Sequence, residues 1–222
     1  MAVLYILSEG ARDELFYDIL AERITGNAYE SSEDLRLRHG ANWKTALAGG
    51  RLLLNRVKHW TEPQEIAVIL AIDNDRSPGH PGSASHPRPL VGMDLKKPPR
   101  YPAVVQMIED ALGSDRSQWP VDVALAMPVE MIESWVLLFC EPQRPALPIF
   151  AEASQPGTRA YYGQTPPPQL KDLCKSEAAG CAKSLEEFFW HAAEQDIEAA
   201  AAASSSLLMF VDQLRSWRKY QS

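Results

Sequence analysis

The chain has few cysteines and no long apolar segment, and each scarcity excludes a class of protein. Its three cysteines have neither a CxxC pair nor the Cys/His spacing of a zinc site. We therefore expect reduced thiols, a cytoplasmic protein and no bound zinc. No run approaches the roughly 18 apolar residues of a membrane-spanning helix, so we expect no membrane partner. The opening MAVLYILSEG lacks a basic region and does not predict a signal peptide.

Positive charge is also scarce. The 222 residues include 22 Lys and Arg against 29 Asp and Glu, which gives a net charge of −7. Strong non-specific binding of nucleic acid requires a basic surface that faces the phosphates, and this balance argues against it. A nuclease stays compatible with the charge, because acids clustered in an active site lower the total and bound cations reverse the local field.

What the sequence does contain is an apolar strand that ends in acids. Residues 66–71, IAVILA, predict a strand buried on both faces, and this strand runs directly toward Asp73-Asn74-Asp75. Alternation along an extended chain places Asp73 and Asp75 on the same side. Buried carboxylates need a counter-charge, and Mg²⁺ binds through oxygen ligands that commonly include one or two carboxylates. The alternative is a turn with solvated aspartates.

A second junction of this kind stands at the start of the chain. Residues 2–7 predict the first strand, and Glu9 and Gly10 follow it at once. The next helix is entered through acidic residues, Asp13 and Glu14, which suit a helix N-terminus. In an open parallel sheet, ligands collect outside the carboxyl ends of the strands. Glu9 and the aspartate pair would therefore share one edge if their strands are neighbours.

A third junction follows residues 121–127, which predict another strand. The helix expected over residues 128–139 begins with proline and carries Glu130 and Glu133 on one face. Glu133 is surrounded by apolar neighbours in the sequence, so its carboxylate needs a partner or a cation. Glu130 has an alternative role as a charge that the helix dipole favours.

The stretch from Arg76 to Tyr101 is long, irregular and rich in Pro, Gly and Ser. Loops of this length inside compact domains are commonly functional or disordered. We expect Arg76, Lys96 and Lys97 to bind substrate phosphate beside the acids; a flexible surface loop is the alternative. The stretch also carries the cations and histidines His80, His86, Arg88 and Arg100. The two histidines lack metal-ligand spacing, and we expect them to serve the loop.

The rest of the chain divides by composition. Residues 1–140 predict the metal-binding domain, with Leu35–Arg38 as a half-exposed strand and helices over 43–60 and 103–112. Residues 141–168 are rich in proline and indicate a linker or strap. Residues 169–222 indicate a C-terminal helical segment. Its last amphipathic stretch, 207–220, is expected to pack against the core domain or a partner.

The three junctions, in this order, resemble the TOPRIM domain shared by topoisomerases, bacterial primases and OLD-type nucleases. The SEGARDELF and PVEMIESWVLL segments look most like those of OLD-type and small stand-alone bacterial defence proteins. The resemblance covers roughly residues 1–140. It implies an α/β, Rossmann-like, mostly parallel sheet flanked by helices, here with a C-terminal helical appendage. The chain departs from the OLD-type proteins, which carry an ATPase, in having no Walker motif, so any ATPase would be a separate subunit.

The resemblance implies Mg²⁺- or Mn²⁺-dependent cleavage of DNA or RNA, in phage defence or DNA repair. Two metal ions can stabilise both the attacking and the leaving oxygen of an in-line displacement. The implied catalytic residues are Glu9, Asp73, Asp75 and Glu133. The implied metal ligands are Glu9, Asp13, Asp73, Asp75, Glu130 and Glu133, with Glu14 as a substitute.

Two other functions stay open. The first is a catalytically weak TOPRIM-like scaffold within a multi-protein assembly, which the acidic charge and the helical tail favour; homo-oligomers are compatible with it. The second is a small-molecule phosphohydrolase with Asp73 as nucleophile. It fits less well, because that chemistry usually places its DxD after the first strand, where this chain has glutamate.

Overall fold

The computed structural model describes most of the first 129 residues and the C-terminal end of the chain. The described residues are 2–9, 13–31, 42–60, 65–75, 77–84, 96–129, 132, 135, 139, 196–202 and 204–220.

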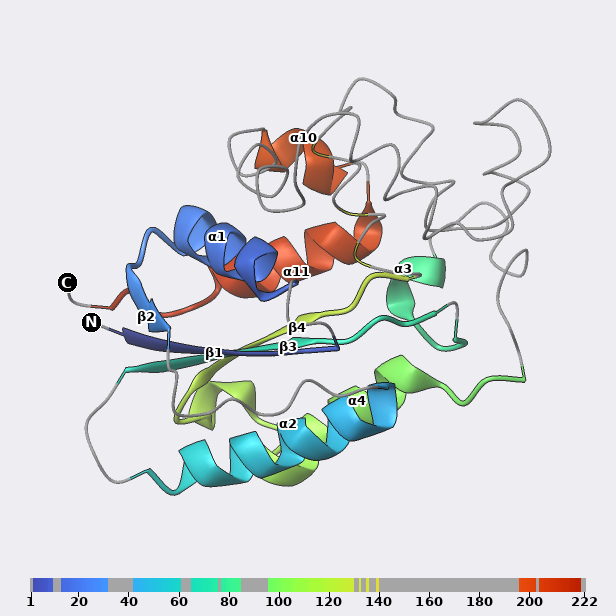
Figure 1. The fold of residues 1–222 in the computed structure, drawn as a ribbon, viewed down its shortest axis with the longest axis horizontal. Helices are drawn as coiled ribbons and strands as arrows, with labels where there is room; N and C mark the ends of the chain where they lie inside the picture. Colours follow the sequence, from blue (N-terminus) through green and yellow to red (C-terminus); the bar gives the residue numbers. More distant parts are fainter. Residues whose placement is uncertain are drawn as a thin grey trace. The chain divides into compact units, whose positions relative to one another are not determined.

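Four parallel strands form one sheet in the order β2-β1-β3-β4 (Figure 1). The strands are β1 (Ala2–Ser8), β2 (Tyr29–Ser31), β3 (Ile66–Ala71) and β4 (Asp122–Ala126). Three of them confirm the strands predicted at 2–7, 66–71 and 121–127. β2 was not predicted, and it precedes the strand expected at Leu35–Arg38, which lies outside the described residues. Every residue of β3 is buried, as expected for a central strand covered on both faces.

Helices flank the sheet on both faces, which makes this an α/β fold (Figure 1). The longer helices are α1 (Glu14–Thr25), α2 (Trp43–Lys58), α4 (Arg100–Leu112) and α11 (Ser205–Arg215). The short ones are α3 (Pro81–Ala84), η2 (Arg116–Gln118) and α10 (Ile197–Ala202). Figure 1 places α1 and α11 over one face of the sheet and α2 and α4 over the other. Within the described ranges, no helix has the length and apolarity needed to cross a membrane.

Local sequence explains where α2 begins and how closely it approaches the sheet. Asn42 caps the helix, since its side-chain oxygen accepts from the backbone N–H groups of Lys44 and Thr45. A Cβ at Gly50 would lie 3.0 Å from the Met107 Cε atom and 3.4 Å from a Leu70 methyl carbon. The second glycine of the Gly-Gly pair therefore lets α2 pack closely against β3 and α4.

The chain forms two compact units. The sheet unit comprises residues 1–72, 101–126 and 210–222, and the loop unit comprises residues 73–100 and 127–209. The rings of Tyr17 in α1 and Phe210 in α11 meet edge to face, 5.8 Å apart, and both are buried in the sheet unit. The end of the amphipathic C-terminal stretch thus packs against the core domain, one of the two roles expected for it.

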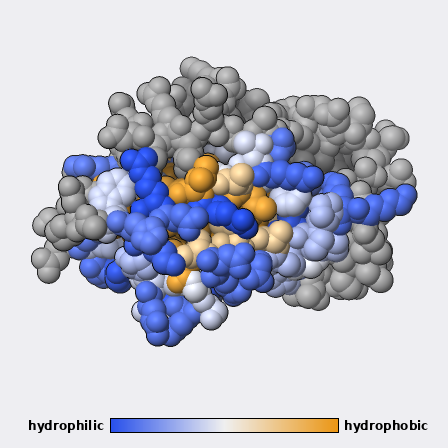
Figure 2. All heavy atoms as spheres, turned by 90° about the horizontal axis from the view of Figure 1, so that it is seen from below, coloured by the Kyte–Doolittle hydropathy of each residue, from blue (hydrophilic) through white to orange (hydrophobic). Residues whose placement is uncertain are grey.

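Hydrophobic residues also reach the surface on the side of α2 and α4. Figure 2, viewed from below, shows them at the centre of a hydrophilic surround. Two large hydrophobic side chains are exposed among the described residues, and Leu52 of α2 is the more exposed of them, with 68% of its surface accessible to solvent. Single exposed leucines are common on protein surfaces and need no functional explanation.

Candidate functional site

The first predicted junction lies in the sheet unit. β1 and β3 are adjacent parallel strands, and their register pairs Ser8 with Ala71. The two strands therefore end level with each other at the carboxyl edge of the sheet. Glu9 follows β1 directly, and Asp13 lies at the N-cap position of α1 with Glu14 in the first turn. The condition for a shared edge, that these two strands are neighbours, is met.

The turn that follows β3 belongs to the loop unit and is anchored by Asn74, which is fully buried. Its backbone N–H donates to the Pro128 carbonyl at 3.1 Å. Its side-chain amide donates to the carbonyls of Ser77 at 2.9 Å and Val129 at 3.3 Å. Both side-chain partners are acceptors, so the orientation of the amide is fixed. Asn74 thus ties the turn to the segment that follows β4.

Asp73 contacts the third predicted junction. One of its carboxylate oxygens accepts a hydrogen bond of 3.1 Å from the backbone N–H of Ile132. Ile132, Trp135 and Phe139 are helical and buried, which agrees with those positions of the helix predicted over 128–139, but Pro128 and Val129 are not helical, so the predicted start at the proline is wrong. A carboxylate on an N–H group at the start of a helix is a favourable cap. Glu130 and Glu133 lie outside the described residues.

Asp75 adopts a left-handed backbone conformation with φ of 47°, which aspartate tolerates better than most residues. Its carboxylate pairs with the Arg100 guanidinium, with Nη2 and Oδ2 2.6 Å apart. The same guanidinium donates through Nη1 to the Asp73 carbonyl at 2.6 Å. Lys97 donates to the Asp75 carbonyl at 2.7 Å. These bonds hold the turn, and Arg100 supplies Asp75 with a counter-charge.

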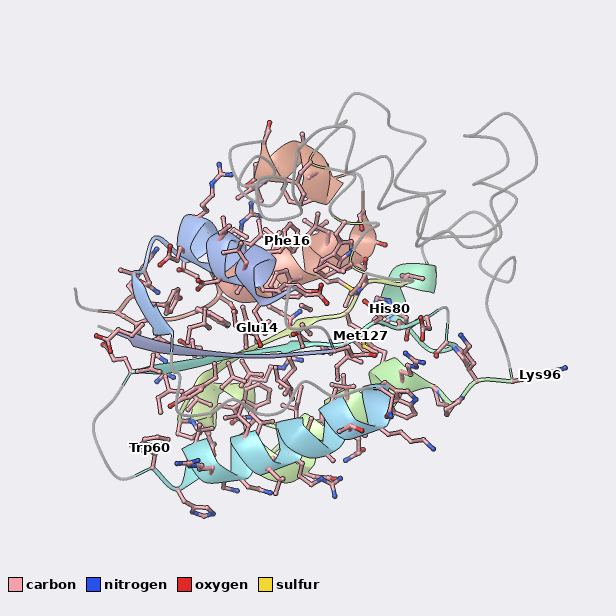
Figure 3. The ribbon with its side chains drawn as sticks, in the orientation of Figure 1. Glu14, Phe16, Trp60, His80, Lys96 and Met127 are labelled. Carbon is pink, nitrogen blue, oxygen red and sulfur yellow. The ribbon has the colours of Figure 1, made fainter. Side chains whose placement is uncertain are left out.

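The predicted phosphate ligands have different positions. Lys97 lies beside the turn and bonds to a backbone carbonyl, whereas Lys96 is exposed (Figure 3). Arg76 lies outside the described residues. Sequence reasoning did not select Arg100 or Asn74. The available signals were the position of Arg100 just before an apolar helix and that of Asn74 between the two aspartates.

His80 is a structural residue of the loop unit, and Figure 3 shows it beside Met127. Its Nδ1 accepts from the Gly82 N–H at 2.9 Å, so its Nε2 carries the proton and donates to the Met127 carbonyl at 2.7 Å. Burial lowers the pKa of His80 to about 4, because the charged imidazolium would be desolvated. Both ring nitrogens are therefore occupied in a neutral histidine.

The turn offers oxygen donors of the kind that Mg²⁺ prefers. Asp73 and Asp75 are carboxylates, and the Asn74 Oδ1 atom is buried without a hydrogen-bond partner among the described residues. Hard oxygen ligands of this kind fit Mg²⁺ or Mn²⁺ by their chemistry. Over the same residues, no group of three His, Cys, Asp or Glu side chains is arranged to hold a metal ion. A complete ligand set therefore requires further residues.

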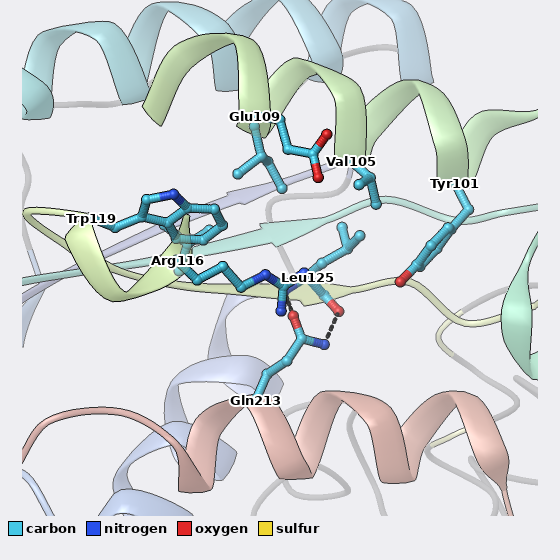
Figure 4. A pocket seen from close by; sticks show the side chains of 9 residues that line it. Tyr101, Val105, Glu109, Arg116, Trp119, Leu125 and Gln213 are labelled. Atoms are coloured by element: carbon cyan, nitrogen blue, oxygen red, sulfur yellow. Dashed lines mark hydrogen bonds between the residues drawn. The ribbon is translucent and has the colours of Figure 1, made fainter. Parts of the chain in front are cut away.

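A small cavity lies at the β4 edge of the sheet unit (Figure 4). Its volume of about 10 Å³ has room for one water molecule and not for an organic ligand. The lining side chains include Tyr101, Val105, Glu109, Arg116, Trp119 and Gln213.

Comparison with known proteins gives no relative: no family model, no curated protein and no solved structure matches this chain.

Proposed function

We propose that the protein is a Mg²⁺- or Mn²⁺-dependent nuclease of the TOPRIM type that cleaves DNA or RNA. A role in phage defence or DNA repair, with a separate ATPase subunit, is part of the proposal. The register that pairs Ser8 with Ala71 carries it. Glu9 follows one of these adjacent strands and the Asp73–Asp75 turn follows the other, at the edge where parallel sheets collect ligands.

In this proposal, Glu9, Asp73 and Asp75 contribute to one metal site, which ligands outside the described residues complete, because the described acids by themselves form no group that could hold an ion. Asp13 and Asp73, with Glu133 or Glu130, hold a second. Bound metal of this kind polarises a phosphoryl oxygen and lowers the pKa of a coordinated water molecule. Lys97 contributes positive charge near the turn, which would offset the charge that develops on the phosphate during cleavage.

The decisive experiment compares Glu9→Gln and Asp73→Asn with wild type, using DNA and RNA substrates with Mg²⁺ and with Mn²⁺. Asparagine at position 73 retains an oxygen that can accept from Ile132, so the helix cap survives while the charge is lost. We expect cleavage to fall by about 100-fold or more in both variants. Asp110→Asn on the exposed face of α4 removes the same charge and should cleave normally. Undiminished cleavage by both site variants would exclude this site.

One observation favours the alternative function, a TOPRIM-like scaffold without strong catalysis. Arg100 already balances the charge of Asp75, so the turn is electrostatically satisfied without a metal ion. Calorimetric titration of the full chain with Mg²⁺ and Mn²⁺ separates the two functions. A nuclease must bind at least one of these ions, and Asp73→Asn must weaken that binding. A scaffold shows no uptake that depends on Asp73.

A further inference from the structure

Arg100 is unusual among the arginines of the described surface, because its side chain is only 10% exposed while its partner Asp75 is 42% exposed. It is the first residue of α4, and its guanidinium bridges a carboxylate and a backbone carbonyl of the same turn. Two short bonds from one planar group fix the position of its charge. By contrast, the pair between Arg51 and Asp110 spans 3.9 Å with both side chains more than half exposed.

We infer that Arg100 competes with a divalent cation for the Asp73–Asp75 turn. In the metal-free protein, the guanidinium supplies the positive charge that the ion would bring, and the turn stays formed and charge-balanced. The inference rests on the metal site of the proposed function. It adds that Arg100 sets the ion concentration at which the site fills.

Electrostatics indicates that Arg100 competes with the ion and does not merely position Asp75 to bind it. A rigid guanidinium favours the geometry of Asp75, but it also places a positive charge within contact distance of any ion on that carboxylate. Repulsion between charges this close exceeds the gain from one preorganised side chain at the reduced dielectric of a partly buried site. The Lys97 ammonium lies 2.7 Å from the Asp75 carbonyl oxygen and also repels a cation at this turn. A divalent ion therefore binds at the cost of the Arg100 contact.

The test measures Mn²⁺ affinity of the full chain by electron paramagnetic resonance, which needs no nuclease activity. Arg100→Gln removes the positive charge and retains a hydrogen-bond donor. We expect this variant to bind Mn²⁺ about tenfold more tightly than wild type, since removing one like charge at contact distance from the ion has at least this effect. Arg51→Gln changes the net charge equally at an exposed pair and should leave the affinity unchanged.

A measurement on wild type covers the case in which Arg100→Gln does not fold. Adding diamagnetic Mg²⁺ should change the ¹⁵N guanidinium signal of Arg100 from a slowly exchanging, bonded state to a freely rotating one. The same titration should leave the Arg51 signal unchanged. A guanidinium signal that stays bonded at saturating Mg²⁺ would show that the ion and Arg100 bind together, and the inference would be wrong.

The outcomes separate this inference from the proposed function. If wild type binds Mn²⁺ and Arg100→Gln binds it equally or less tightly, competition is excluded while the metal site stands. If neither protein binds Mn²⁺ at millimolar concentration, the metal site and the competition are both excluded, and the pair with Asp75 is structural. Tighter binding in both Arg100→Gln and Arg51→Gln would assign the effect to net charge and would also overturn the inference.

Discussion

Tyr220 donates a hydrogen bond of 2.6 Å to the Asp122 carboxylate at the start of β4, and its hydroxyl also lies 3.2 Å from the Ile66 carbonyl at the start of β3. The backbone N–H of Arg218 donates to the same carboxylate, and Asn27 donates to the Arg218 carbonyl. Residues 216–220 thus form a C-terminal strap across the amino ends of two strands. Burial raises the pKa of Tyr220, and the hydrogen bond to Asp122 raises it further by a smaller amount.

Tyr220→Phe removes this hydroxyl and leaves the ring. Because hydrogen bonds to charged groups contribute roughly 1.5–3 kcal/mol, and Arg218 still pairs with Asp122, we expect a loss of about 1.5 kcal/mol in unfolding free energy. Urea denaturation followed by tryptophan fluorescence measures it. Tyr5→Phe is the matched control, since the Tyr5 hydroxyl has no hydrogen-bond partner within the described ranges. Equal stability of Tyr220→Phe and wild type would show that the strap does not hold the sheet.

Gln213 protects the β4 edge of the sheet that the described residues form. The Ala126 carbonyl points toward β3, where it accepts a hydrogen bond from the Ile72 N–H. Successive residues of a strand alternate in direction, so the N–H and carbonyl of Leu125 point away from β3. The Gln213 side chain accepts from the Leu125 N–H at 2.9 Å and donates to its carbonyl at 3.4 Å, as drawn in Figure 4. The amide thereby occupies the place of a neighbouring strand.

Gln213→Ala exposes both backbone groups of Leu125 and creates an edge available for pairing with another chain. We expect about 1 kcal/mol of destabilisation and concentration-dependent self-association. Sedimentation velocity over a range of concentrations measures the association. Gln106→Ala, which removes an exposed amide from α4, should sediment as wild type does. A variant at position 213 with unchanged sedimentation would show that the edge is protected by other means.

The apolar strands were predictable because burial on both faces leaves a continuous hydrophobic run, as in residues 66–71. β2 was not, because a strand of three residues, Tyr-Glu-Ser, has no periodicity to detect. The same limit applies to the site. Local sequence indicates the acids after the strands, but the partner of Asp75 lies 25 positions further along the chain, and its approach depends on tertiary structure.

Asn74 shows the second limit. An asparagine between two aspartates predicts a turn, and the hydrogen bond that the Asn74 side chain donates to the Ser77 carbonyl belongs to such a turn. Its bond to Val129, however, joins segments 55 positions apart. Neither composition nor spacing carries information on such a contact. The chemistry of the acids was therefore predictable as a class, whereas the network that orients them was not.

Asp18 of α1 is held in an unfavourable environment. Burial, with a smaller contribution from Glu22 one turn later, raises the pKa of Asp18 from 3.8 to about 6. The native state therefore holds a proton that the unfolded state releases between these values. Stability contributed by Asp18 is present below pH 3.8 and is lost as the pH rises through 6. Because the side chain is partly solvated, we expect a change of about 1 kcal/mol.

Asp18→Asn removes the charge and should stabilise the protein at pH 7 by about this amount, with a much smaller gain near pH 4. Thermal denaturation at several pH values measures the difference from wild type. Asp212→Asn, at an exposed carboxylate of α11, should give no comparable gain. A constant difference between Asp18→Asn and wild type across this range would show that the carboxyl does not titrate with a raised pKa.

His80 has the opposite dependence on pH. The folded protein holds it neutral with a pKa of about 4, whereas the unfolded chain takes up a proton near 6.5. The stability that it contributes is complete above pH 6.5 and is lost as the pH falls through 4. The full difference corresponds to about 3 kcal/mol, because the ring is buried and weakly screened.

His80→Gln cannot gain this proton, so its stability should fall less steeply than that of wild type between pH 6.5 and 4. The variant loses part of the bonding to Gly82 and Met127, so we expect it to be the less stable protein at pH 7 by about 1–2 kcal/mol. The two stability curves should therefore converge as the pH is lowered. Parallel curves for His80→Gln and wild type would mean that His80 gains its proton at the same pH in the folded and unfolded states. A protonated Nδ1 could not accept the hydrogen bond from Gly82.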